Sequence, residues 1–279
     1  MTIAEDASTP AVLQVATGTT GTGTTASFSP PAGSLVVVTV VVAYASNSAG
    51  TTGASTPLSC ADSLSNSYAL GVFVNPYVPS GSFLFNTAIF TYYYASAPGS
   101  VTVTVTNSNT SSADLDVCAR VLTGAAASQA GAATAALNGA LTETSPQPSG
   151  SITTTTTGSW VYVAGGIGSY DGPVVLSGTT QIDYRTGLNR TLVAGRKTAA
   201  TVTPGAVTVG WTTGFSEIPQ WAALEILPPS SGGGYSSYPY GTPHSGSEGN
   251  TFTGTDTNAN VGEPNALGVL PLGTPHGLA

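Results

Sequence analysis

The run of residues 33–44, Gly-Ser-Leu-Val-Val-Val-Thr-Val-Val-Val-Ala-Tyr, constrains the fold of this chain more than any other stretch. Valine packs well on a pleated surface and loses side-chain freedom in a helix, so a run of this length predicts a central β-strand. Because its apolar residues are continuous rather than alternating, we expect both faces of the strand to be covered.

The order of strand signals in the first half of the chain occurs again in the second half. The matched pairs of stretches are 33–44 with 158–167, 58–68 with 176–184, 86–93 with 190–197, 97–105 with 203–211, and 114–122 with 220–227. A repeated order of this kind predicts a duplicated all-β unit. We expect an antiparallel, jelly-roll-like β-sandwich made of two pseudo-repeated halves that together complete one sandwich, with two separate small domains as the alternative.

The predicted boundaries follow from changes in composition. We expect an N-terminal arm at 1–9 and a sandwich at 10–229, with halves at about 10–124 and 151–229. The Ala/Gly/Ser/Thr-rich stretch 125–150 is predicted to be a crossover holding at most one helical turn. Residues 230–279 have almost no core candidates, so they are predicted to form an extended tail.

Three tyrosines in the predicted tail have no core of their own to join. They are candidate anchors in the surface of a neighbouring subunit, an environment that suits tyrosine: Tyr235, Tyr238 and Tyr240. The other notable aromatics, Tyr92 to Tyr94, Trp160, Trp211 and Trp221, lie in strand-like runs and are expected to serve the core.

Charge and composition exclude several classes of partner. Only 6% of the residues are charged, and thirteen acids against five bases give a net charge of -8. The bases form no stripe that could follow a phosphate backbone, so neither nucleic acid nor an anionic lipid surface is an expected partner. We find no secretory signal and no apolar run long enough to span a bilayer, and we expect a soluble protein made without export.

The sequence predicts neither an enzyme nor a cofactor or metal site. Both histidines, His244 and His276, lie in the predicted tail, which excludes a Ser-His-Asp arrangement within the sandwich. Asp114 and Asp116 share one face of a strand but lack the further oxygen ligands that calcium needs. Residues 62–66 are predicted to form a hairpin tip, and the glycines at 165–168 to be strand-end glycines rather than a phosphate loop.

Two further residue sets leave alternatives open. The carboxylates that could supply a glycoside hydrolase pair are Asp171, Asp183, Glu217 and Glu225, but no sequence feature selects two of them. Cys60 and Cys118 each fall in or beside a predicted strand. Two small buried thiols are favoured for them, with a disulfide as the alternative.

Several stretches resemble the β-sandwich modules of actinobacterial phage virion proteins, often labelled minor tail proteins. The first half carries Pro-Pro-Ala-Gly-Ser-Leu-Val-Val-Val at 30–38, Ala-Asp-Ser-Leu-Ser-Asn-Ser-Tyr at 61–68, Ala-Ile-Phe-Thr-Tyr-Tyr-Tyr-Ala at 88–95, Pro-Gly-Ser-Val-Thr-Val-Thr at 98–104 and Ala-Arg-Val-Leu-Thr-Gly at 119–124. The second half opens with Gly-Ser-Trp at 158–160 and closes with Ala-Leu-Glu-Ile-Leu-Pro at 223–228. The resemblance covers about 30–228 and leaves the tail outside.

The resemblance implies a structural role in a virion, assembled in the host cytoplasm. The leading expectation is a minor tail, tail-tip or fibre-like subunit with its sandwich exposed and its tail bound to neighbouring subunits. A capsid decoration or head-fibre protein is one alternative, and a carbohydrate-binding module for host attachment is another. Expected partners are therefore other virion proteins, further copies of this chain in a homo-oligomer of which trimers are a common form, and a host cell-surface glycan.

Overall fold

The computed structural model describes residues 2–15, 21–44, 57–74, 84–108, 113–138, 148–167, 172–187, 190–212 and 219–230. All regular secondary structure in these residues is β-strand, and their strand pairings are antiparallel. The all-β antiparallel fold predicted from the sequence is therefore confirmed. The described residues contain no helix long and apolar enough to cross a membrane.

The first half of the chain forms two sheets around one core. The larger sheet contains β1 (Ala4–Glu5), β2 (Leu13–Val15), β9 (Ala113–Thr123), β4 (Ser34–Tyr44), β7 (Leu84–Tyr94) and β6 (Ala69–Val74). Its order is β9-β4-β7-β6, with β1 and β2 both paired to β9. The smaller sheet has the order β3 (Thr22–Thr24), β8 (Val103–Asn107), β5 (Leu58–Asp62). Val36 and Val38 of β4 pack with Val103 and Val105 of β8 in the first core.

The second half forms two sheets with the same succession of pairings. The larger sheet has the order β10 (Thr134–Asn138), β17 (Pro219–Ile226), β12 (Trp160–Ile167), β15 (Arg190–Lys197), β14 (Thr179–Gly187). The smaller sheet has the order β11 (Ser149–Thr154), β16 (Gly205–Thr212), β13 (Val174–Val175). The core of this half contains Val161 and Val163 of β12 together with Trp211 and Trp221.

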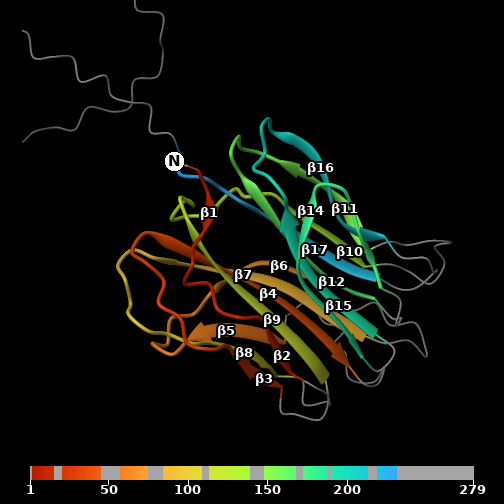
Figure 1. Cartoon of the computed structure of the whole chain (residues 1–279), viewed down its shortest axis with the longest axis horizontal. Helices are drawn as coiled ribbons and strands as arrows, with labels where there is room; N and C mark the ends of the chain where they lie inside the picture. The colour runs from red at the N-terminus through yellow and green to blue at the C-terminus, as the bar shows by residue number, and fades with distance from the viewer. Residues whose placement is uncertain are drawn as a thin grey trace, which may run out of the picture. The chain divides into compact units, whose positions relative to one another are not determined.

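The two larger sheets pack face to face, and we call this contact the seam (Figure 1). Across the seam β4 contacts β12 and β15, while β7 contacts β12 and β17. Leu35 and Val37, on the second face of β4, pack there with Tyr162, Leu224 and Ile226. Every residue of β4 is buried, so the structure confirms the prediction that both of its faces are covered.

The structure differs from the sequence-based expectation in how the halves combine. They do not complete a single sandwich, because each half has its own two sheets and its own core. The physical reason lies in the second apolar face of β4 and of β12: neither face can stay in water, and each covers the other. The halves are not separate domains either, since residues 1–233 cluster as one compact unit.

The predicted arm and crossover are both built into the sheets. In the predicted arm at 1–9, β1 pairs with β9 and Ile3 is buried in the seam. The predicted crossover at 125–150 contains β10 and the beginning of β11, and no helical turn is described there. Ala135 and Leu137 pack against the second core, so β10 covers an edge of β17 that would otherwise be open.

The hairpin tip predicted at 62–66 is confirmed. The Asp62 Oδ1 atom accepts hydrogen bonds from the backbone N–H groups of Leu64 and Asn66, both at 2.9 Å. Ser65 adopts a left-handed conformation with φ of 67°. Burial of the carboxyl opposes its ionisation, but hydrogen bonds from the Tyr94 hydroxyl, the Asn66 side chain and these two N–H groups outweigh that effect and hold the pKa of Asp62 below its usual value.

Candidate functional site

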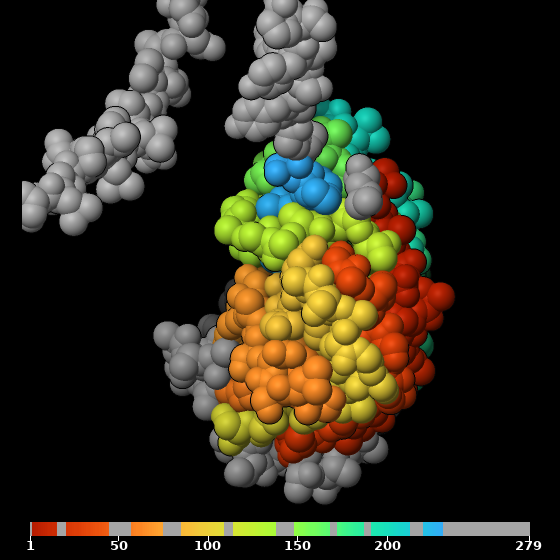
Figure 2. Space-filling model, turned by 90° about the vertical axis from the view of Figure 1, so that its left-hand side faces the viewer, coloured from red at the N-terminus to blue at the C-terminus, as the bar shows by residue number. Residues whose placement is uncertain are grey.

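A groove of about 600 Å³ lies along one end of the seam. Its walls come from β6 and β7 of the first half and from residues 127–134 and Leu224 of the second. Figure 2 looks onto this side of the molecule, where a lime-green surface lies between the orange and yellow first half and the blue end of β17. The groove therefore exists only because the two halves are packed together.

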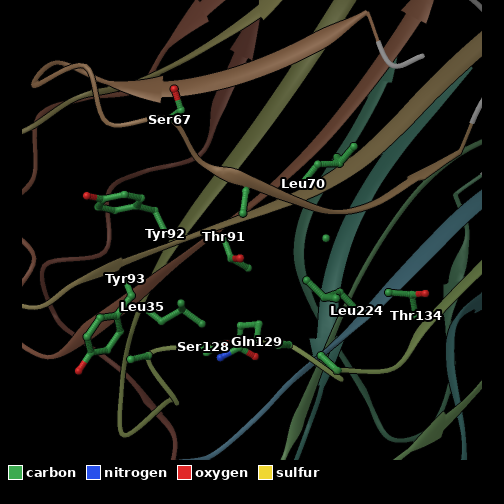
Figure 3. Close-up of a pocket in the computed structure, with 15 residues that line it drawn as sticks. Leu35, Ser67, Leu70, Thr91, Tyr92, Tyr93, Ser128, Gln129, Thr134 and Leu224 are labelled. Carbon is green, nitrogen blue, oxygen red and sulfur yellow. Dashed lines mark hydrogen bonds between the residues drawn. The ribbon is translucent and has the colours of Figure 1, made fainter.

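Tyrosines form one end of the groove (Figure 3). The edge strand β6 pairs with β7 only as far as Thr91, so Tyr92 and Tyr93 continue beyond the paired region. The Tyr92 ring stacks on Tyr68 with centroids 5.2 Å apart and meets the edge of Tyr94 at 4.9 Å. Tyr93 is half-buried and packs against the apolar layer of the seam. Both rings are thus held in place before any ligand arrives.

The opposite wall is fixed by the side chain of Gln129. Its Nε2 donates to the backbone oxygen of Ala126 at 2.9 Å, and its Oε1 accepts from the Leu227 N–H at 2.8 Å. The Ala126 N–H donates in turn to the Leu227 oxygen at 2.8 Å. These bonds tie the wall to the chain that follows β17.

Glu225 anchors the far end of the same wall. Its carboxylate accepts hydrogen bonds from the backbone N–H groups of Ala133 at 3.0 Å and Thr155 at 2.9 Å. Burial of the carboxyl opposes its ionisation, but these hydrogen bonds outweigh that effect and lower the pKa of Glu225 below its usual value. The wall is consequently part of the folded scaffold.

The floor of the groove is apolar and comes from both halves. Leu35 of β4 and Leu224 of β17 are 1% and 2% exposed. A glycine at position 71 lets β6 approach this floor, because a Cβ atom there would lie 2.6 Å from the Leu224 Cδ2 atom. Figure 3 shows Leu70 and Leu224 at the end of the groove away from Tyr93.

The groove is electrically neutral. None of its lining residues in the described part of the chain is an acid or a base, and the polar groups are hydroxyls and amides, including those of Ser67, Thr91, Ser128 and Thr134. Such a lining offers hydrogen bonds and van der Waals contact to an uncharged ligand.

A second polar cluster, the acidic seam cluster, lies between β9 and β14. The Arg185 guanidinium donates to Asp116 Oδ1 at 2.9 Å and to Asp114 Oδ1 at 3.3 Å. Asp183 accepts from Gln14 Nε2 at 2.8 Å and from the Cys118 thiol at 3.8 Å. The cluster thus brings three carboxyl groups together, and the Arg185 guanidinium bridges two of them, Asp114 and Asp116.

Burial dominates the ionisation of this cluster. Burial raises the pKa of Asp116 to about 7, and the nearby charges of Asp183 and Asp114 act in the same direction against the opposing effect of Arg185. Asp116 Oδ2 is buried and has no hydrogen-bond partner among the described residues. The cluster joins the two halves and does not face the groove.

The candidate residues from the sequence fall into separate places. Asp114 and Asp116 do share one face of β9, as predicted, and that face binds Arg185. Asp183 belongs to the seam cluster and Glu225 to the groove wall, so these two carboxylates serve separate hydrogen-bond networks. The described residues hold no group of three or more side chains suited to a metal ion.

Several other predicted residues lie outside the described ranges. They are Asp171, Glu217, Tyr235, Tyr238, Tyr240, His244 and His276. The glycines at 165 and 166 lie within β12, where a Cβ atom on Gly166 would overlap the ring of Phe85. Close packing across the seam therefore explains Gly166.

The two cysteines are buried and free. Cys60 belongs to the first core, whereas Cys118 points from β9 into the seam beside Asp183. Burial raises the pKa of both thiols. The predicted small buried thiols are what the structure contains, and the disulfide alternative is not formed.

Comparison with known proteins gives no match to a family model, a curated protein or a solved structure. The groove was also not identified from the sequence, which indicated a core role for Tyr92 and Tyr93. Consecutive strand residues point to opposite faces, so three tyrosines in a row at 92–94 are a signal that at least one ring leaves the first core.

Proposed function

We propose that this chain is a structural protein of a phage virion, a minor tail, tail-tip or fibre-like subunit with its paired sheets exposed. The observation that carries the proposal is the strand order that occurs in both halves. It adds a physical argument to the resemblance of 30–228 to virion β-sandwich modules.

The strand order supports a jelly-roll interpretation of each half. The order β2-β9-β4-β7 faces β3-β8-β5 in the first half, and β10-β17-β12-β15 faces β11-β16-β13 in the second. Eight-stranded jelly rolls place their strands in this way and are common in viral capsid and lectin domains. Both halves depart from that arrangement at one strand: β6 pairs with β7 and β14 pairs with β15, so each smaller sheet has three strands. In the first half the isolated Ala61–Ser67 bridge connects the residues just before β6 to β5.

The N-terminal segment supports a role as one solid building block. β1 belongs to the sheet of the first half, yet Glu5 accepts hydrogen bonds from Arg196 at 3.0 Å and from the Tyr162 hydroxyl at 3.1 Å, both in the second half. Arg196 also lies over the Trp160 ring, 4.5 Å from its centroid. The segment thus fastens the two halves together, which suits a subunit exposed on a particle.

Mass spectrometry of purified virions tests the proposal. We expect the chain in the particle at a handful of copies, the number typical of a tail tip. Hundreds of copies would replace the tail assignment by the alternative, a capsid decoration or head-fibre protein. Particles without the chain would overturn the virion role altogether.

A deletion of residues 230–279 tests the proposed role of the tail in binding neighbouring virion proteins or further copies of the chain. The truncated protein retains the described sheets, so we expect it to fold and to be lost from the particle. Incorporation at the normal copy number would contradict that role.

A further inference from the structure

We propose that the groove between β6, β7 and residues 127–134 binds a short, uncharged oligosaccharide, with one sugar face against Tyr93. The inference deepens the proposed function, because it names what an exposed virion subunit would hold on to. Oligosaccharide binding is tested on the isolated protein, whereas the structural role is tested on the virion.

The lining selects an uncharged ligand. A carboxylated, sulfated or phosphorylated sugar would need a basic partner, and the described residues lining the groove include no arginine or lysine. The net charge of the chain, -8, opposes the approach of an anion as well. A cationic ligand would equally lack a carboxylate in the lining.

The same lining fits the two-sided chemistry of a sugar ring. A pyranose has one face of C–H groups and a rim of hydroxyls. The C–H face suits the electron-rich face of a tyrosine ring and the apolar floor of Leu35 and Leu224. The hydroxyl rim suits the hydroxyls of Thr91 and Ser128 and the exposed backbone of the Gln129 wall. A purely apolar ligand would leave these polar groups without partners.

The size and rigidity of the groove suit binding of a short chain. Its volume of about 600 Å³ lies within the range of small-ligand sites, about 300–1,000 Å³. The stacked Tyr92 and the doubly bonded Gln129 fix both walls in advance. Little side-chain freedom is left to lose on binding, and this preorganisation favours affinity.

Tyr93 is the residue on which the proposal depends most. The Tyr92 ring already contacts Tyr68 and Tyr94, whereas Tyr93 rests on the seam and borders the groove beside Leu35 (Figure 3).

The test uses the full-length purified chain and a defined set of probes. Short gluco-, galacto-, manno-, arabino- and N-acetylglucosamine-based oligosaccharides are screened by saturation-transfer NMR, together with sialylated and uronic-acid oligosaccharides. We expect transfer to at least one uncharged oligosaccharide and an affinity that added salt leaves unchanged, since no ion pair is involved. The best ligand is then titrated by calorimetry.

Substitutions locate the bound sugar. Tyr93→Ala is expected to weaken binding about tenfold, which corresponds to about 1.4 kcal/mol. Tyr93→Phe keeps the ring and should stay within about threefold, or about 0.7 kcal/mol. Tyr184→Ala is the matched control, because Tyr184 is a partly exposed tyrosine on β14 that does not line the groove. Thr91→Val gives a second variant that removes one lining hydroxyl at nearly constant volume.

Three results would overturn the inference: no transfer to any uncharged oligosaccharide by the folded wild-type chain, binding confined to the acidic sugars, or an affinity equal in Tyr93→Ala, Thr91→Val and wild type. If Tyr93→Ala does not fold, the decision falls to Thr91→Val, which must weaken binding while Tyr93→Phe stays within about threefold of the wild type. A negative result with the chain present in virions would leave the structural role standing.

Discussion

Arg185 of β14 reaches across the seam and donates a hydrogen bond to Asp116 of β9 at 2.9 Å. Asp116 accepts it with one oxygen, while its other oxygen is buried. Asp114, Cys118 and Arg120 share the same face of β9, and Asp183 and Gln14 approach it from β14 and β2. One guanidinium therefore bridges two carboxylates in a place that water barely reaches.

The free energy of unfolding should depend on the ionisation of Asp116. Its pKa is about 7 when folded and near 3.8 when unfolded, so between about pH 4 and about pH 7 the folded state holds a proton that the unfolded state has released. Ionisation of Asp116 therefore lowers the free energy of unfolding as the pH rises through that window, and this contribution stays constant at higher pH. Urea unfolding of the wild type and of Asp116→Asn across this pH range measures the contribution of Asp116 to the free energy of unfolding.

The Asp116→Asn variant retains an oxygen acceptor for Arg185 and cannot titrate. We expect the wild type to lose stability relative to Asp116→Asn as the pH rises from about 4 to about 7. Asp62 and Glu225 have lowered pKa values, so their contributions are lost only at lower pH and do not mask this difference. Parallel curves for the two proteins across the window would contradict the prediction.

Removing the guanidinium should be more damaging than removing a surface charge. Arg185→Met leaves Asp114 and Asp116 buried without their bridging cation, and loss of one member of such a buried pair costs about 3–5 kcal/mol. Lys197→Met is a suitable comparison, because the Lys197 ammonium donates to a backbone oxygen and, among the described residues, forms no ion pair. Urea unfolding measures the free energy of unfolding of both variants. If Arg185→Met lowers it no more than Lys197→Met does, Arg185 adds little to the stability of the seam.

Gly71→Ala should destabilise the protein and narrow the groove. The added Cβ would lie 2.6 Å from the Leu224 Cδ2 atom and 3.2 Å from the backbone oxygen of Ile89, so β6 or the buried Leu224 side chain has to shift. Overpacking of this kind costs about 1–3 kcal/mol. At Gly172 the added Cβ would meet the Tyr184 hydroxyl at 3.4 Å, an ordinary contact, and no other described residue within 4 Å. Gly172→Ala is therefore the control, and equal thermal midpoints for the two variants would count against the tight contact.

Glu5→Ala should loosen the N-terminal segment without unfolding the sheets. It removes the contacts to Arg196 and Tyr162, which are partly exposed and worth up to about 1 kcal/mol. Hydrogen exchange should become faster at the Asp6 N–H, which donates to the Val121 oxygen, and stay unchanged in β4. Unaltered exchange at Asp6 would mean that the pairing of β1 with β9 is enough to hold the segment without the contacts of Glu5.

The sequence was informative where one strand carries its own pattern. The valine run of β4 indicates a strand buried on both faces, and the alternation of Val103 and Val105 with threonines in β8 indicates one dry and one wet face, as the structure has them. The Asp62–Asn66 tip was equally local in its turn geometry, since the two hydrogen bonds that Asp62 Oδ1 accepts come from Leu64 and Asn66, within four positions.

The features that could not be predicted depend on which strand faces and edges of the two halves pack together. The partner of Asp114 and Asp116 is Arg185, a residue of the other half, and no local pattern connects them. β10 forms from an alanine-rich stretch with weak strand preference because the open edge of β17 binds it. The groove arises from the same cause: it needs Tyr93 from one half and Gln129 from the other.

The close contact between Phe85 and Gly166 affects how the two halves fit together. Phe85 packs in the seam with Val41, Ala164 and Leu192, in space that a side chain at Gly166 would fill. Gly166 stands eight positions after Gly158, and Val41 stands eight positions after Gly33, so Val41 is its counterpart in the first half. A valine at position 166, the residue type found at position 41, would overlap the Phe85 ring, because even a Cβ atom at Gly166 would do so. The seam is thus built from unlike residues at this point, since the glycine of the second half makes room for the aromatic ring of the first.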